Sequence, residues 1–150
     1  MKLYDHIQID ASPSSVWKVL ADPNLMELWN PKCLRSDAGN GPYGVGFVYQ
    51  ASFKLGDNPE RLAECMIEEY EPGASLTTKY SGSAFKRQGY VRESYRLTAK
   101  NGGTRVQQTL DFTHSEISIF IQLIMKVINA VGSAAGKGPL DGIKELAEVE

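Results

Sequence analysis

The sequence contains 150 residues, with 16 Lys and Arg against 18 Asp and Glu and a formal net charge of −2. That length is typical of one domain with a substantial core, so we expect a single domain over residues 1–150. The charges give no excess of positive charge for binding nucleic acid. No apolar run reaches the length of a membrane span. We therefore predict no nucleic-acid partner and no transmembrane segment.

The two cysteines, Cys33 and Cys65, lie far apart and neither belongs to a CxxC pair. We expect both to be free thiols. The first residues, Met1 to His6, contain no long apolar region, so no secretory signal is visible. A reducing, cytoplasmic location is the simplest prediction.

The N-terminal segment predicts a strand followed by two short helices. Ser12 is a good helix N-cap and Pro13 suits the first helical position, so a helix should run over residues 13–21. Asp22-Pro23 repeats this start signal. The second helix should end after Trp29, because the next residues lead into a proline.

The order of these signals resembles that of a known family. An apolar strand, Ala-Ser-Pro, Val-Trp, Leu-Ala-Asp and then Trp-Asn-Pro resemble the opening of the START-like (SRPBCC) superfamily, and most of all its polyketide cyclase/dehydrase and lipid-transport family. The resemblance implies an α+β helix-grip fold. In that fold a curved antiparallel β-sheet wraps around a long C-terminal α-helix, two short helices follow strand 1, and a ligand cavity lies between sheet and helix. Members include binders, carriers and enzymes, so the likeness does not define the chemistry.

The middle of the chain predicts an antiparallel meander. Glycines lead into an alternating run at residues 47–53, which is typical of a strand. Turn-forming residues then separate further strands. These are expected near residues 61–70, 74–80, 87–99 and 104–114.

The segment 117–131 predicts an unusually apolar helix. Its only polar residues form one narrow stripe: Ser118, Gln122, Lys126 and Asn129. Because an ordinary surface helix buries a stripe of about 100°, this one should contact apolar groups on more than one side. Glycines from Gly132 to Gly138 then interrupt the pattern, either as a hinge or as a plain loop. Leu140 and Ile143 resume it.

Strand parity selects the candidate polar site. Glu93 shares a strand face with Tyr95 and apolar neighbours, and Gln108 shares a face with His114. If these faces point inward, a desolvated Glu93 would have a raised pKa and could act as an acid or donate to a ligand carbonyl. The alternative pairs Glu93 with an arginine or with a side chain of a neighbouring strand.

Other chemistries lack sequence support. His6 and His114 have no third ligand at a recognisable spacing, so no metal is predicted. The glycines of residues 41–46 precede a strand rather than a helix, unlike a phosphate-binding loop. No Gly-x-Ser-x-Gly occurs, which leaves nucleophilic hydrolysis without support. No cofactor is predicted.

We expect the protein to bind a hydrophobic small molecule, such as a lipid, polyketide-like or isoprenoid compound, as a carrier or sensor. The candidate ligand-binding residues are Trp29, Phe47, Tyr49, Tyr80, Glu93, Tyr95, Gln108, Leu110, Phe112, Phe120 and Ile124. One alternative is a cyclase/dehydratase-like enzyme, with Glu93 or His114 as acid or base and Tyr95 as orienting donor. The other is an interaction module that forms a homodimer through the apolar helix.

Overall fold

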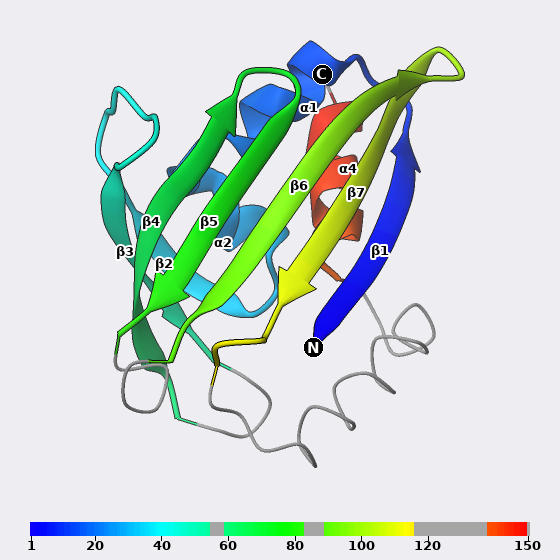
Figure 1. The fold of residues 1–150 in the computed structure, drawn as a ribbon. Coiled ribbons are helices and arrows are strands. Elements are labelled where there is room, and N and C mark those ends of the chain that lie inside the picture. The colour runs from blue at the N-terminus through cyan, green and yellow to red at the C-terminus, as the bar shows by residue number, and fades with distance from the viewer. Residues whose placement is uncertain (55–58, 83–88, 116–137, 150) are drawn as a thin grey trace.

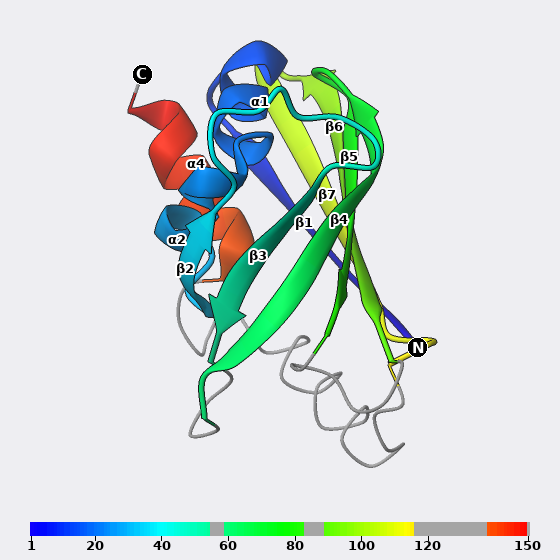
Figure 2. The ribbon, with the colours of Figure 1, turned by 90° about the vertical axis from the view of Figure 1, so that its left-hand side faces the viewer.

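The computed structural model describes residues 1–54, 59–82, 89–115 and 138–149. These form a curved, seven-stranded antiparallel sheet in the order β1-β7-β6-β5-β4-β3-β2 (Figure 1). Its strands are β1 (Lys2–Ile9), β2 (Cys33–Asp37), β3 (Val48–Phe53), β4 (Arg61–Glu71), β5 (Ser75–Ser81), β6 (Val91–Lys100) and β7 (Gly103–Asp111). The helices are α1 (Pro13–Leu20), η1 (Pro23–Leu25), α2 (Met26–Trp29) and α4 (Pro139–Glu148). Figure 2 shows α1, α2 and α4 together on one side of the sheet.

The two helix starts predicted from the sequence are confirmed. The Ser12 side chain accepts a hydrogen bond from the backbone of Ser15, and α1 begins at Pro13. The Asp22 side chain accepts one from the backbone of Asn24. The second helix is divided into the 3₁₀ turn η1 and the short helix α2.

The meander is also confirmed, with three differences. β6 begins four residues later than the predicted 87–99, at Val91, and β7 ends at Asp111 rather than at residue 114. The Asp111 side chain accepts a hydrogen bond from the backbone of Thr113 at 3.0 Å, and this Asx turn ends the strand. β2 was not predicted, because a register shift between Cys33 and Arg35 interrupts its alternation of buried and exposed residues.

Helix α4 packs closely on α2. Its buried residues are Leu140, Gly142, Ile143 and Ala147, which confirms the predicted resumption of the apolar pattern. A Cβ atom on Gly142 would lie 2.1 Å from the carbonyl oxygen of Trp29. Only glycine therefore allows the two backbones to approach this closely, and α4 holds Trp29 against the sheet.

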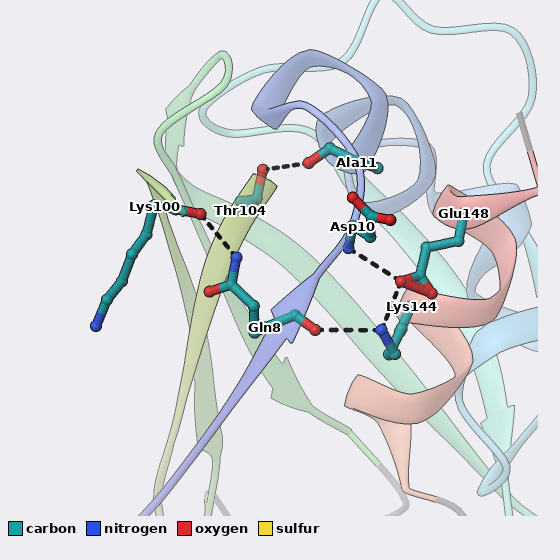
Figure 3. Close-up of polar contacts among 7 residues, drawn as sticks. All are labelled: Gln8, Asp10, Ala11, Lys100, Thr104, Lys144 and Glu148. Atoms are coloured by element: carbon teal, nitrogen blue, oxygen red, sulfur yellow. Dashed lines mark hydrogen bonds and ion pairs between the residues drawn. The ribbon is translucent and has the colours of Figure 1, made fainter. Parts of the chain in front are cut away.

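Polar contacts tie α4 to the end of β1 (Figure 3). Lys144 Nζ donates to the Gln8 carbonyl at 3.3 Å and pairs with Glu148 Oε1 at 2.5 Å. The same Glu148 oxygen accepts from the Asp10 backbone at 3.0 Å. The helix is thereby fixed to the strand edge as well as to the core.

The turn between β6 and β7 is fastened to the same part of the chain (Figure 3). Gln8 Nε2 donates to the Lys100 carbonyl at 2.7 Å, and Thr104 Oγ1 donates to the Ala11 carbonyl at 2.8 Å. A Cβ atom on Gly103 would lie 2.3 Å from a carbonyl oxygen of β1. The close approach requires glycine, and it holds the start of β7 against the end of β1.

The predicted apolar helix over residues 117–131 lies outside the described residues. Phe120 and Ile124 lie outside them too. Of the break between Gly132 and Gly138, the structure describes only Gly138, which precedes α4. The choice between hinge and loop, and the dimer alternative that depends on this helix, stay as predictions.

Candidate functional site

Four buried polar side chains meet on the inner face of the sheet. Tyr80 Oη, on β5, donates to Glu93 Oε1 at 3.0 Å. Gln108 Nε2, on β7, lies 3.2 Å from Glu93 Oε2 and 3.0 Å from Tyr95 Oη. The strand register brings them together, because Tyr95 is paired directly with Gln108. Glu93 lies two residues before Tyr95 in β6 and therefore on the same face of the sheet. We call these four residues the inner polar cluster.

Burial controls the protonation of the inner polar cluster. Desolvation raises the pKa of Glu93, although hydrogen bonds from Tyr80, Tyr95 and Gln108 partly oppose the rise. Desolvation also raises the pKa values of Tyr80 and Tyr95 far above the usual value, so both are neutral phenols at physiological pH. Two of the partners of Glu93, Tyr80 on β5 and Gln108 on β7, are side chains of neighbouring strands, which is a pairing that the sequence analysis had left open.

A small cavity of about 10 Å³ adjoins the inner polar cluster. That is room for about one water molecule. Its described lining contains one carboxyl, from Glu93, and no Lys, Arg or His side chain. The lining residues are Leu20, Ala21, Pro23, Met26, Trp29, Tyr49, Ile67, Leu76, Thr78, Tyr80, Glu93 and Tyr95.

Trp29 forms part of the cavity wall. It is one of the candidate ligand-binding residues predicted from the sequence, and it is only 4% exposed, with α4 packed against its backbone. Its ring contacts Tyr95 edge to face, with centroids 5.8 Å apart and planes at 86°. The indole Nε1 is buried and has no hydrogen-bond partner within the described part of the chain.

The remaining candidates lie around this cavity or away from it. Phe47 does not line the cavity but packs beside it, with its ring 6.4 Å from that of Tyr49. Leu110 and Phe112 belong to a smaller apolar cluster with other residues of the sheet. His114 is exposed and stacks on Tyr90 with ring centroids 4.9 Å apart, so it is not part of the inner polar cluster.

Sequence reasoning missed seven residues of the wall, and two of them, Thr78 and Met26, lie beside the inner polar cluster. Thr78 is the direct cross-strand partner of Glu93, and a correct register would have predicted it. Met26 lies 3.7 Å from Tyr80 Oη through its sulfur and is 1% exposed. Its position depends on the short helix α2, and no motif in the sequence indicates it.

The fold and the inner polar cluster define a helix-grip protein with a buried, partly polar centre. Residues 1–148 match the family described as polyketide cyclase / dehydrase and lipid transport. The chain therefore belongs to this family. A search of curated proteins found no match.

Solved structures show the same fold at low sequence identity. The crystal structure of Ara h 8.0201 is similar with a TM-score of 0.70 and 15% identity, over 100% of this chain and 99% of that one. Protein MLL2253 from Mesorhizobium loti has a TM-score of 0.70 and 16% identity, over 99% and 98% of the two chains. The Aha1 dimer from Colwellia psychrerythraea has a TM-score of 0.59 and 18% identity, over 90% and 92%.

Two further findings apply to the described residues. They contain no group of three His, Cys, Asp or Glu side chains placed to hold a metal ion. Their helices include none long and apolar enough to cross a membrane.

Proposed function

We propose that the protein binds a hydrophobic small molecule against the inner face of its sheet, as a carrier or sensor. The observation that carries this proposal is the composition of the cavity wall. Apolar and aromatic side chains surround a few directed polar groups, which is the general form of a small-molecule site. Membership of a family described by polyketide chemistry and lipid transport supports the same function.

Binding requires the wall to open. The cavity of about 10 Å³ is far below the roughly 300–1,000 Å³ of typical ligand sites. Met26 is the wall residue best suited to move, because an unbranched thioether side chain adopts many conformations at low cost. The ligand would thus select an opened state, and its apparent affinity would be reduced by the rarity of that state.

Native mass spectrometry of the protein as expressed tests this proposal first, since a bound hydrophobic molecule would add a defined mass. An environment-sensitive dye then measures uptake by the purified protein. We expect about one dye per folded chain, displaced by medium-length fatty or aromatic compounds. Absence of uptake in both dye titration and calorimetry, with the protein folded, would show that its own side chains fill the site.

A cyclase or dehydratase-like activity is the second candidate. Glu93 favours it, because a buried carboxyl with a raised pKa beside two neutral phenols is a suitable general acid. Glu93→Gln should keep ligand uptake but remove conversion of a bound polyketide-like ketone, since an amide cannot exchange the proton. A variant that keeps full conversion would eliminate Glu93 as the acid, and mass spectrometry of the product would measure it.

We also propose a reducing, cytoplasmic location. Cys33 and Cys65 are both buried free thiols, which supports it. Desolvation raises the pKa of Cys33 to about 11 and raises that of Cys65 further, so neither is a ready thiolate. Alkylation of the folded protein should therefore be slow, and alkylation after unfolding should modify two thiols.

A further inference from the structure

We propose that the ligand is a neutral molecule whose carbonyl oxygen accepts a hydrogen bond from Trp29 Nε1, and that fatty carboxylates are excluded. This inference rests on the proposed function and names the class of ligand. Three observations support it: the open donor on Trp29, the charge of the wall and the size of the cavity.

Trp29 provides the open donor. The indole N–H is a donor only, so another donor cannot satisfy it. Buried polar groups in folded proteins nearly always have partners, and Trp29 Nε1 has none among the residues that the structure describes. The inner polar cluster does not need a ligand in the same way, because Glu93 already accepts from Tyr80 and Gln108. One acceptor on the ligand therefore completes the site.

The charge of the wall selects a neutral ligand. Glu93 is the one acid of the described lining, and that lining holds no cation to compensate a carboxylate on the ligand. Lys32 acts on Glu93 electrostatically, but it is exposed and outside the lining. A fatty carboxylate would be desolvated without a counter-ion and placed near a second acid. A ketone, aldehyde or ester brings an acceptor oxygen without that charge.

The size of the cavity fits one oxygen atom. At about 10 Å³ it holds a water-sized group beside the wall that Trp29 helps to form. A ligand carbonyl would occupy this space, while the apolar body of the ligand would displace the Met26 side chain from its place in the wall. The polar contact thus fixes orientation, and the apolar contacts supply most of the affinity.

Three probes of nearly the same shape test the inference by calorimetry. Acetophenone carries the carbonyl, α-methylstyrene replaces the oxygen by a methylene group, and benzoate carries a charge. We expect acetophenone to bind about tenfold more tightly than α-methylstyrene, the ratio for one good hydrogen bond. Benzoate should bind more weakly than either. Trp29→Phe should remove the preference for acetophenone and keep α-methylstyrene binding, whereas Trp17→Phe on α1 should keep the preference.

A second measurement does not depend on the folding of a variant. In a nitrogen-correlated NMR spectrum of the unmodified protein, acetophenone should shift the indole N–H signal of Trp29 downfield, and α-methylstyrene should not. Binding of α-methylstyrene with no preference for acetophenone, or equal binding of benzoate, overturns the carbonyl inference alone, as does dye uptake that no probe displaces. Failure of every probe and of the dye overturns the proposed function itself.

Discussion

Arg92 and Glu93 are neighbours on β6, yet their side chains lie on opposite faces of the sheet. On the outer face, Arg92 Nε pairs with Glu68 Oε1 at 2.7 Å, with side chains 36% and 26% exposed. On the inner face, Glu93 is 6% exposed and its partners are two phenols and an amide. One residue of strand parity thus separates a solvated ion pair from a desolvated acid.

Each face also holds a tyrosine in a contrasting setting. Tyr90 has Lys79 Nζ 4.4 Å and the Arg92 guanidinium carbon 4.8 Å from its ring centroid, with His114 stacked beside it. Tyr95 instead contacts Trp29 and accepts a hydrogen bond from Gln108. The cations therefore gather on the outer side, and the inner side holds neutral donors around Glu93. The comparison explains why a neutral ligand suits the inner face.

The largest effect on stability is expected at α2, which also has a buried and an exposed side. Met26 is 1% exposed and lines the inner cavity, whereas Leu28 is 64% exposed. Met26→Ala should lower the free energy of unfolding by about 3 kcal/mol, through lost burial and an added cavity. Leu28→Ala should change it by less than about 0.5 kcal/mol. Urea unfolding measures both. Met26→Ala should also bind the dye more tightly, because part of the wall is already open; a variant that is destabilised yet takes up less dye would contradict that.

Local sequence patterns predicted some features of this structure and could not predict others. Ser12-Pro13 and the parity of Glu93 and Tyr95 are local patterns, and each predicted its structure correctly. Trp29 could not be placed from such patterns, because its burial depends on Gly142 of α4, which is distant in the sequence. His114 has the same nominal parity as Gln108, but the turn at Asp111 ends the strand before it. Local signals therefore predicted elements and faces, while long-range contacts decide which side chains meet.

Removal of each carboxyl provides the next comparison. Glu93→Ala should lower the free energy of unfolding by about 2 kcal/mol, because Tyr80 and Gln108 lose a buried acceptor. Glu68→Ala should lower it by no more than about 1 kcal/mol, as expected of an exposed ion pair. Chemical unfolding at neutral pH measures both changes. Equal losses would mean that the inner polar cluster adds nothing beyond a surface contact.

The pH dependence should have opposite signs on opposite faces. Because folding raises the pKa of Glu93, the folded state holds its proton more tightly, and the contribution of Glu93 to stability should fall as pH rises above the ordinary glutamate pKa of 4.5. At Asp111, desolvation is outweighed by hydrogen bonds from Thr113 that lower the pKa, so its contribution should be lost as pH falls below 3.8. The groups that act on Glu93 include Tyr80, Tyr95, Gln108 and Lys32.

Unfolding measured from pH 3 to pH 8 in the variants tests these signs. Relative to the unmodified protein, Glu93→Gln should gain stability as pH rises above 4.5, since the amide does not ionise. Asp111→Asn should be less stable than the unmodified protein above pH 3.8, and this difference in stability should disappear in acid. A Glu93→Gln difference that is constant with pH would show that Glu93 titrates alike in the folded and unfolded chains.

The smallest effect concerns salt. Exposed charges are screened over about 3 Å at 1 M ionic strength, against about 10 Å at 0.1 M, while buried groups are screened much less. Glu68→Gln should therefore destabilise the protein by about 0.5 kcal/mol at 0.1 M salt and by less at 1 M, because its partner Arg92 lies on the solvated face. The difference between Glu93→Gln and the unmodified protein should change little with salt, since its partners are neutral and buried. Urea unfolding at the two salt concentrations measures both variants. An effect of Glu93→Gln that disappears at 1 M salt would place water and ions at the inner polar cluster, and the contrast between the two faces would then be lost.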